Sequence, residues 1–260
     1  MENNPNVLEI KNLSKSFEDS NGTVKALEEI NLSIEKGEFI TIVGQSGCGK
    51  STLLRLISGL DKEYDGEILF EGNKVKGTSN DIGMVFQEAR LFPWKTVKEN
   101  ILYSLDKKIS KEEKEKIVDE YLELVQLKDF KNSYPNQLSG GMQQRISIAR
   151  ALANNPRILL FDEPFGALDA LTRINMQNEV LRIWKAEKKN MILVTHDIDE
   201  AIYLGDKVVI MSSRPGTIKK VVKIELGRPR NRTSYDFMKT RKEIYDEFFE
   251  EPKSEIEYNI

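Results

Sequence analysis

Three short apolar runs, each followed at once by polar residues, dominate the pattern of the chain. They lie at residues 39–43, 157–161 and 191–195. Apolar runs of this length that are rich in β-branched residues are typical of strands buried on both faces. Helical spacing of apolar residues occurs between them, at residues 50–58 and 170–189. Strands that alternate with helices predict an α/β fold, with a parallel sheet covered by helices on both faces.

Alternating apolar and polar positions predict further strands on either side of this core. They lie at residues 7–17, 26–39, 66–71, 82–86, 208–211 and 217–226. Residues 107–131 are dense in Lys and Glu with apolar residues at helical spacing, which predicts an amphipathic helix. Another helix is expected to begin near Ser139, and a last charged helix is expected at residues 235–250. The region from about residue 88 to 155 is therefore interpreted as a helical insertion in an α/β chain.

Composition places the chain among ordinary globular proteins, with 31% charged and 39% hydrophobic residues. Lys and Arg number 39 against 42 Asp and Glu, and a net charge of −3 does not indicate a nucleic-acid-binding surface. No apolar run reaches the ~18 residues of a membrane span. The N-terminal residues do not resemble a signal peptide. We therefore expect a cytoplasmic protein that depends on a partner for any membrane role.

The residues after the first apolar run match the pattern G-x-x-x-x-G-K-[ST], which is typical of a phosphate-binding loop. They are Gly44, Gln45, Ser46, Gly47, Cys48, Gly49, Lys50, Ser51 and Thr52. Glycines permit a tight path in which N–H groups surround phosphate oxygens, and the following helix directs its positive end at them. We expect Lys50 to contact the β- and γ-phosphates of a nucleotide, and Ser51 to ligate Mg²⁺.

Cys48 is the single cysteine of the chain and lies inside this loop. It excludes an intramolecular disulfide and suits a reducing compartment. Its role is left open: it is either a small filler, or a thiol made more acidic than usual by a helix N-terminus. The second alternative predicts that a thiol alkylator blocks nucleotide binding and that Mg-ATP protects against it.

Carboxylates and an imidazole follow the other two apolar runs. Ligands gather where parallel strands end, so Asp162, Glu163 and His196 are expected near the phosphate loop. Asp162 fits a ligand of the metal beside Ser51, and Glu163 fits a general base for the attacking water. His196 is the only histidine. A structural role is the alternative for it, but its place at a strand end favours contact with the γ-phosphate.

Residues 138–145, with the sequence LSGGMQQR, resemble the signature of ABC ATPases and lie between the phosphate loop and Asp162, as in that family. Gln87 resembles the Q-loop glutamine of the family, which implies a role in catalysis and metal binding. Similarly, Ala167, Leu168 and Asp169 resemble its D-loop, His196 its H-loop, and Phe17 the aromatic residue on which adenine stacks. A core position is the alternative for Phe17.

The resemblance covers nearly the whole chain. It implies a P-loop NTPase core of the RecA-like type, with an N-terminal antiparallel β subdomain and an inserted α-helical signature subdomain. The implied ABC ATPase domain spans residues 1–226, with its core at 5–87 and 156–226, the helical subdomain at about 88–155 and a charged helical tail at 227–260. The resemblance also implies ATP and Mg²⁺ as cofactors. The implied catalytic residues are Glu163, His196, Gln87 and Lys50.

Ser139, Gly140 and Gly141 form a second anion-binding feature, because they lie at the start of a helix. One nucleotide does not need two such features from one chain, although an ordinary capped helix is the alternative. In the resembled family, a head-to-tail homodimer closes this segment on ATP held by the phosphate loop of the other chain. The resemblance therefore implies a homodimer with ATP at its interface.

Residues 91–101 include Phe92, Pro93 and Trp94 and resemble the segment of bacterial importers that meets an integral membrane permease. Packing inside the helical region is the alternative for these three residues. Four further segments, residues 167–173, 197–201, 213–218 and 227–230, resemble the nitrate/sulfonate/taurine importer group. The last of these could equally be a solvated loop.

The resemblance to importers implies a peripheral subunit on the cytoplasmic face of the membrane. Its partners would be a permease and, indirectly, an extracytoplasmic solute-binding protein, with no nucleic acid. One alternative is an ATP-binding subunit for another cargo, such as a vitamin precursor. Another is a soluble ABC protein that acts as a nucleic-acid or ribosome switch.

Overall fold

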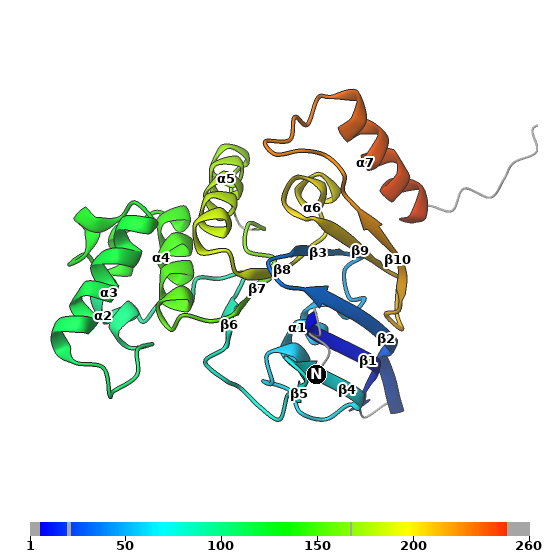
Figure 1. Ribbon diagram of the computed structural model, residues 1–260, viewed down its shortest axis with the longest axis horizontal. Helices are drawn as coiled ribbons and strands as arrows, with labels where there is room; N and C mark the ends of the chain where they lie inside the picture. Colours follow the sequence, from blue (N-terminus) through cyan, green and yellow to red (C-terminus); the bar gives the residue numbers. More distant parts are fainter. Residues whose placement is uncertain (1–5, 20–21, 167, 249–260) are drawn as a thin grey trace, which may run out of the picture.

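The computed structural model describes residues 6–19, 22–166 and 168–248 (Figure 1). Its strands are β1 (Asn6–Asp19), β2 (Gly22–Glu35), β3 (Phe39–Val43), β4 (Asp65–Phe70), β5 (Asn73–Lys74), β6 (Ile82–Val85), β7 (Ile158–Asp162), β8 (Asn190–Thr195), β9 (Lys207–Met211) and β10 (Ile218–Lys223). Its helices are α1 (Lys50–Ile57), α2 (Val97–Leu102), α3 (Lys111–Leu124), α4 (Gly140–Ala153), α5 (Ala170–Glu187), α6 (Ile198–Leu204) and α7 (Tyr235–Phe248). Two 3₁₀ turns, η1 (Lys128–Phe130) and η2 (Pro135–Gln137), connect α3 to α4.

The larger sheet has six strands in the order β10-β9-β3-β8-β7-β6, and only the edge strand β10 is antiparallel to its neighbour. Every residue of β3 and β8 is buried. The register pairs Val43 with Thr195 and Val194 with Asp162, so that the three central strands end at one edge. The predicted parallel sheet is therefore confirmed, and the polar residues after these strands meet there.

Helices and a second sheet cover the two faces of the larger sheet. Successive side chains of a strand point to opposite faces, so Ile40 and Ile42 pack with α1 and the antiparallel sheet β2-β1-β4-β5. On the other face, Phe39 and Phe161 pack with residues of α4 and α5 such as Val180. Full burial of such side chains contributes roughly 1.5–3 kcal/mol each. The phosphate loop is thus carried by a strand packed on both faces.

The helices α2, α3 and α4 form a lobe at one end of the molecule (Figure 1). The helix expected at residues 107–131 is shorter, because Ser110 caps α3 by accepting a hydrogen bond from Glu113 N, and Gln126 leaves the helix with a φ of 58°. Helix α2 was not predicted. Its signal was present as a capping box, in which Thr96 and Glu99 each accept a hydrogen bond from the other's backbone N–H.

Other element boundaries differ from the expected ones in small ways. The stretch 26–39 holds the end of β2, a turn and the first residue of β3 rather than one strand, and the last strand is Ile218–Lys223. The final helix α7 begins at Tyr235 as expected. The expected residues 249 and 250 of this helix lie outside the described part of the chain.

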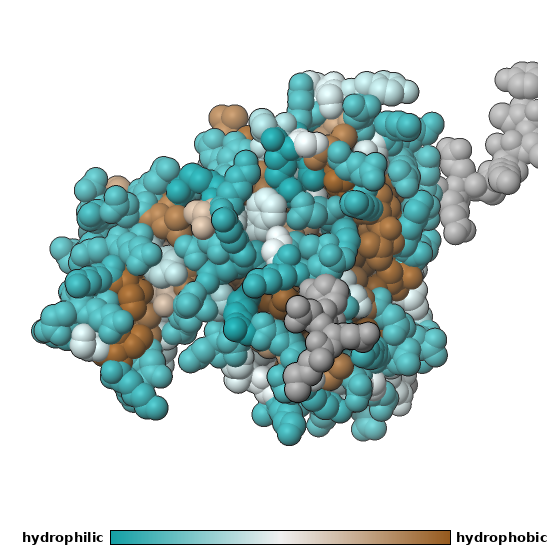
Figure 2. Space-filling model, in the orientation of Figure 1, coloured by the Kyte–Doolittle hydropathy of each residue, from teal (hydrophilic) through white to brown (hydrophobic). Residues whose placement is uncertain are grey.

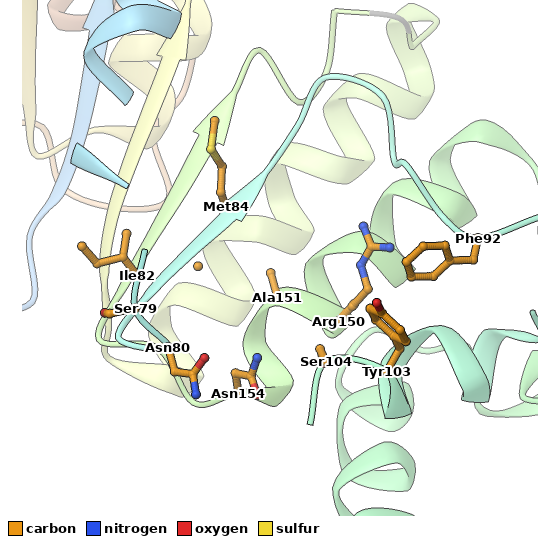
Figure 3. A pocket seen from close by; sticks show the side chains of 11 residues that line it. Ser79, Asn80, Ile82, Met84, Phe92, Tyr103, Ser104, Arg150, Ala151 and Asn154 are labelled. Atoms are coloured by element: carbon orange, nitrogen blue, oxygen red, sulfur yellow. The ribbon is translucent and has the colours of Figure 1, made fainter. Parts of the chain in front are cut away.

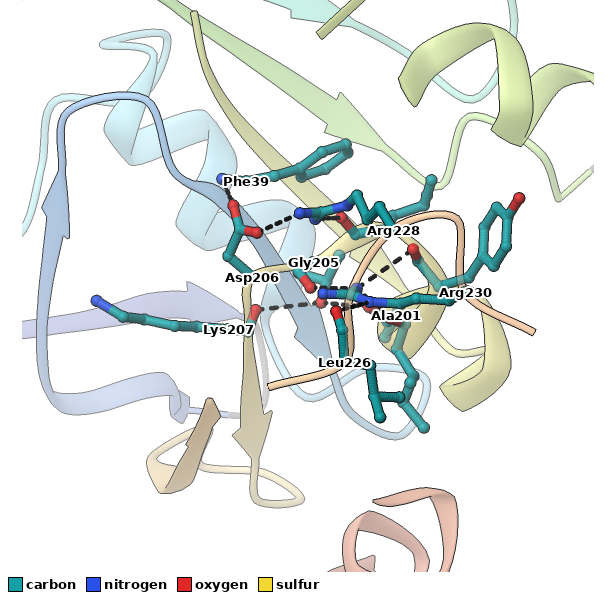
Figure 4. A network of polar contacts seen from close by, with 12 residues as sticks. Phe39, Ala201, Gly205, Asp206, Lys207, Leu226, Arg228 and Arg230 are labelled. Carbon is teal, nitrogen blue, oxygen red and sulfur yellow. Dashed lines mark hydrogen bonds and ion pairs between the residues drawn. The ribbon is translucent and has the colours of Figure 1, made fainter. Parts of the chain in front are cut away.

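Both arginines of residues 227–230 bind the protein, contrary to the alternative in which this segment is a solvated loop. Arg230 is only 7% exposed, and its guanidinium donates hydrogen bonds to the carbonyl oxygens of Ile202 and Gly205 at the end of α6 (Figure 4). Burial, and next to it the charge of Arg228, lowers the pKa of Arg230 to about 10. Arg228 pairs with Asp206. The two arginines therefore fasten the C-terminal segment to α6.

The surface is mostly hydrophilic on the face shown in Figure 2, with hydrophobic residues gathered over β9 and β10 and on the lobe of α2 and α3. Within the described ranges, no helix combines the length and the apolar character that crossing a bilayer requires.

Candidate functional site

The loop between β3 and α1 has the geometry of an anion cradle. Gly47 and Gly49 have φ values of 79° and 100°, in a region that residues with a Cβ rarely adopt. A Cβ at Gly49 would also lie 2.6 Å from Leu27 Cδ2. Helix α1 has no side-chain cap and no acidic residue in its first turn. Its first N–H groups have no partners within the helix and can bind an anion.

Lys50 lies under this loop and is only 5% exposed. Its Nζ donates hydrogen bonds to the carbonyl oxygens of Gly44, at 2.9 Å, and Gln45, at 3.2 Å. The same Nζ lies 3.8 Å from Glu163 Oε1. A buried ammonium held by carbonyl oxygens at the mouth of the loop can serve as a fixed positive charge for phosphate oxygens.

Ser51 and Asp162 are in direct contact, because Ser51 Oγ donates a 2.7 Å hydrogen bond to Asp162 Oδ1. Hydroxyl and carboxylate oxygens are ligands that Mg²⁺ accepts. The described residues contain no group of three or more His, Cys, Asp or Glu that could hold a metal alone. The residues present therefore fit a magnesium ion that takes its other ligands from a nucleotide and water.

Glu163 and His196 also meet at this edge of the sheet. Glu163 Oε2 lies 3.1 Å from His196 Nδ1, and the Glu163 side chain is 25% exposed against 63% for His196. Glu163 has a φ of 44°, a left-handed conformation that costs a non-glycine residue energy and is found at functional sites. Its backbone N–H donates to Val194 O on the neighbouring strand. The carboxylate thus lies between a lysine and a histidine, where it can accept a proton from water.

Gln87 lies across the turn that follows Glu163, since a Cβ added to Gly166 would come within 3.1 Å of Gln87 Nε2. Among the described hydrogen bonds, none joins Gln87 to Ser51 or Asp162. The backbone around Gln87 is held by α4, from which buried Gln144 donates to Phe86 O at 3.0 Å.

Arg150, further along α4, holds the other end of the same segment. It donates hydrogen bonds to the carbonyl oxygens of Ala89, at 3.0 Å, and Arg90, at 2.8 Å. Burial lowers the pKa of this guanidinium. The sequence did not predict a role for Gln144 or Arg150. Their partners are carbonyl oxygens about 60 residues away in the sequence, and carbonyl oxygens leave no signal in a sequence.

The second anion-binding feature lies at the start of α4, in the lobe and apart from α1 (Figure 1). Ser139 Oγ accepts a hydrogen bond from Met142 N at 3.3 Å and so caps α4. A Cβ at Gly141 would lie 2.8 Å from Thr172 Cγ2 in the first turn of α5. Ser139 and its glycines therefore stand beside the start of α5 and not beside Lys50 of the same chain.

Asp169 caps α5 at this place by accepting hydrogen bonds from Leu171 N and Thr172 N. Hydrogen bonds from Thr172 are the main cause that lowers the pKa of Asp169. Ala167, the first residue of the segment that resembles a D-loop, lies outside the described residues.

Phe17 is on the surface, with 42% of its area exposed, so its ring is not part of the core. Lys15 Nζ lies 4.9 Å from the ring centroid, close enough for a cation–π contact. An exposed aromatic face beside the phosphate-loop sheet can stack with a planar base.

The environment of Cys48 decides between the two alternatives left open for its thiol. The residue is 1% exposed, and burial raises the pKa of the thiol, an effect that outweighs the nearby charge of Lys50. A Cβ at Gly44 would lie 2.6 Å from Cys48 Sγ, which shows how closely the thiol packs against the loop. The structure therefore favours the alternative in which Cys48 is a small filler.

A groove of about 350 Å³ lies between β6 and the helical lobe (Figure 3). Phe92, Tyr103 and Arg150 line it, and the rings of Phe92 and Tyr103 meet edge to face with centroids 4.7 Å apart. Trp94 is 71% exposed beside them. Packing of Trp94 inside the lobe, the alternative left open by the sequence, is therefore wrong. Buried Asn100 holds this segment through hydrogen bonds with Phe92 N and O.

Comparison with known proteins identifies relatives over most of the chain. The family model described as ABC transporter matches residues 27–166. The aliphatic sulfonates import ATP-binding protein SsuB of Bacillus thuringiensis subsp. konkukian is 52% identical over 92% of this chain and 94% of that protein. SsuB of Bacillus subtilis is 50% identical over 94% of both. An uncharacterized ABC transporter ATP-binding protein of Methanocaldococcus jannaschii, MJ0412, is 52% identical over 91% of this chain and 89% of that protein.

Solved structures show the same fold. The ATP-binding cassette MJ0796, in a dimeric post-hydrolysis state bound to ADP and Pi, is 36% identical and aligns with a TM-score of 0.73 over 85% of this chain and 100% of that chain. CbiO1 of Clostridium perfringens, part of the transporter complex cbiONQ, is 28% identical and aligns with a TM-score of 0.76 over 85% of this chain and 90% of that chain. The fold and family implied by the motifs are thus confirmed, and the chain belongs to the ABC transporter family as an ATP-binding subunit that hydrolyses ATP.

Proposed function

We propose that this chain hydrolyses Mg-ATP to power the import of a small solute through a separate membrane permease. The observation that carries the proposal is the position of the Glu163 carboxylate, 3.8 Å from Lys50 Nζ and 3.1 Å from His196 Nδ1. Relatives named for aliphatic sulfonate import, at 50% and 52% identity, support a sulfonate-like cargo. The uptake of another solute, such as nitrate or taurine, is compatible with the same cassette.

Phosphate binding is assigned to the loop before α1. Its backbone N–H groups and the positive end of the helix surround the β- and γ-phosphates, with Lys50 as the fixed charge. Bound Mg²⁺ would neutralise charge on the phosphates, held by Ser51 and Asp162 with Gln87 near by. Phe17 offers its exposed ring to adenine. The remaining loop residues, Gln45, Ser46, Gly47, Cys48 and Thr52, belong to the same cradle.

Hydrolysis is assigned to Glu163 and His196. Glu163 accepts the proton of the attacking water, and Lys50 stabilises the negative charge that develops on the γ-phosphate. His196 keeps the Glu163 carboxylate oriented through its Nδ1 and contacts the γ-phosphate with the rest of the ring. The left-handed backbone of Glu163 directs its side chain toward these two partners.

The head-to-tail homodimer explains the second anion-binding feature. Ser139, Gly140 and Gly141 lie in a separate lobe from α1, so they complete a nucleotide site only when two chains face each other. Asp169 lies beside them at the start of α5. The dimeric state of the similar cassette MJ0796, bound to ADP and Pi, supports this arrangement.

The permease is assigned to the groove beside Phe92, Tyr103 and Arg150 (Figure 3). An exposed tryptophan next to an aromatic-lined groove is typical of a protein interface, and it lies on the segment adjoining Gln87. On this proposal, the subunit would lie at the cytoplasmic face of the membrane, with a solute-binding protein acting on the far side. The core at 5–87 and 156–226, the helical part at 88–155 and the tail at 227–260 are the proposed divisions of the chain.

The test is the substitution Glu163→Gln, which keeps the shape of the side chain and removes the base. We expect hydrolysis to fall at least a hundredfold while an ATP-bound dimer accumulates, as measured by phosphate release and by light scattering on a sizing column. The matched control is Glu243→Gln, because Glu243 lies on α7 and pairs with Lys220 on β10, away from the site. Hydrolysis by Glu163→Gln at the parental rate would show that the base is another residue.

The cargo requires a separate experiment. The chain is purified with its permease, reconstituted into vesicles, and supplied with a solute-binding protein and a radiolabelled alkanesulfonate. ATP-dependent accumulation of the sulfonate is the expected result. Accumulation of nitrate alone, or of taurine without any unsubstituted alkanesulfonate, would leave the ATPase assignment intact and exclude an unsubstituted alkanesulfonate as the cargo.

A further inference from the structure

The turn that carries His196 is closed by a hydroxyl group. Thr195 Oγ1 accepts a hydrogen bond from Asp197 N at 3.0 Å and donates one to Glu200 Oε2 at 2.8 Å. Thr195 is 2% exposed. This hydroxyl belongs to the residue before His196 and bonds to two residues after it. The position of His196 therefore depends on which group accepts the Thr195 proton.

Glu200, the acceptor of that proton, is a buried carboxyl in the first turn of α6. It is 5% exposed, and its Oε1 makes no hydrogen bond with the described residues. The charged groups that face it are Asp197, whose Oδ1 caps Glu200 N, and Arg173, which lies 3.8 Å from Asp197. Burial raises the pKa of Glu200 to about 7. Thr195 and the nearby Gln177 amide lower it less.

Gln177 on α5 is near both Glu200, whose pKa its amide lowers, and the C-terminal segment. Arg232 donates a hydrogen bond to Gln177 Oε1. A guanidinium has donors only, so it fixes which end of the amide faces it and leaves the NH₂ group for the side of Glu200. Gln177 is 2% exposed, and Arg232 lies over the ring of Tyr203 at 4.1 Å. Neither side chain is therefore free to turn.

We propose that Glu200 and Arg232 are positioning residues for His196, joined to it through Gln177 and Thr195. This inference rests on the proposed role of His196 in hydrolysis. It gives the C-terminal segment a place in the support of the ATP site, although this segment lies 36 residues beyond His196. A loss of either charged group allows the Thr195 hydroxyl, and with it the turn, to adopt other arrangements.

The experiment measures kcat and KM for ATP in Glu200→Met and Arg232→Met. Methionine keeps the volume of Glu200 without an unpaired polar atom and keeps the stem of Arg232 over Tyr203, so both variants should fold. We expect kcat to fall about tenfold in each, with KM within twofold, because misplacing a catalytic group costs rate rather than binding. In Glu200→Gln, an oxygen remains for Thr195, and we expect most of the rate to return.

The double variant should lose no more rate than the worse single variant, because residues of one network act non-additively. The matched control is Arg241→Met, whose arginine lies 3.1 Å from Asp199 on α6 but contacts no member of this network. Unchanged kcat in both single variants would overturn the proposal. The proposal would also be overturned if kcat fell, KM rose and thermal stability fell together in each single variant, and if these effects added in the double variant. Such a result would indicate a structural role alone.

His196→Ala, measured beside these variants, separates the two proposals. If it hydrolyses ATP at the parental rate, the role of His196 is wrong and the positioning role falls with it. If His196→Ala is inactive while Glu200→Met and Arg232→Met are fully active, only the positioning role is wrong.

Discussion

Ser51 and Asp162 are 111 residues apart in the sequence, yet Ser51 Oγ donates a 2.7 Å hydrogen bond to Asp162 Oδ1. Ser51 lies in the first turn of α1, the helix after β3, and Asp162 ends β7, two strands away in the same sheet. A hydroxyl and a carboxylate brought together in this way offer two oxygen ligands to Mg²⁺ beside the phosphate loop.

Substitution of Ser51 by alanine should therefore raise the Mg²⁺ concentration needed for half-maximal hydrolysis by about tenfold. Losses of metal affinity of this size are typical when a group that holds or orients a metal ligand is removed. A magnesium titration of the ATPase rate measures this effect. Nucleotide binding in EDTA serves as the control and should not change, because the cradle is intact. An unaltered magnesium requirement would show that Ser51 is not a ligand.

The thiol of Cys48 should react slowly with iodoacetamide at neutral pH. Its side chain is 1% exposed and burial raises its pKa, so both access and thiolate fraction are low. We expect labelling at least a hundredfold slower than for free cysteine, measured by mass spectrometry, and a fast rate only in urea. A rate in native protein equal to that of free cysteine would contradict the buried position.

Stability should depend on pH through Glu200. The pKa of this carboxyl rises from 4.5 in the unfolded chain to about 7 in the folded protein, so the folded state holds the proton more tightly. Its contribution is greatest below pH 4.5, is lost as the pH rises to about 7, and is constant above. The full change corresponds to about 3 kcal/mol.

Glu200→Gln, which cannot ionise, should remove this dependence. Its free energy of unfolding relative to the parent should increase between pH 5 and pH 8, as measured by urea titrations at both values. Glu243→Gln, on the exposed face of α7, is the control that should leave the dependence in place. Parallel curves for parent and Glu200→Gln would mean that Glu200 does not titrate in this range.

Arg230→Met should destabilise the fold. The Arg230 guanidinium donates to carbonyl oxygens of Ile202 and Gly205, and its removal leaves these buried oxygens without partners at a cost of about 3 kcal/mol. Urea unfolding measures the change. Arg214→Met is the matched control, since Arg214 is exposed and donates one long hydrogen bond, of 3.4 Å, to Gly47 O. Equal stability of the two variants would contradict the anchoring role of Arg230.

Local sequence was sufficient for the elements with strong periodicity and for residues fixed to strand ends. The apolar runs before Gly44 and Asp162 predicted buried strands, and parallel pairing alone brings their ends together. Sequence was also sufficient for the cap at Ser139. It left the role of Cys48 open, because the position of a residue near a helix N-terminus does not show whether its side chain is covered by packing.

The sequence by itself determined the phosphate loop, the strand ends with Asp162, Glu163 and His196, and the order of motifs that marks the family. Each of these depends on residue types at fixed short spacings, which local backbone geometry turns into a site. Only the tertiary structure decided the contacts of Arg230 with the end of α6 and of Arg232 with Gln177. Arg230 and Gly205 are 25 positions apart in the sequence, and Arg232 and Gln177 are 55 positions apart. Such contacts form between distant segments that packing brings together, and their acceptors are often backbone carbonyl oxygens that every residue possesses.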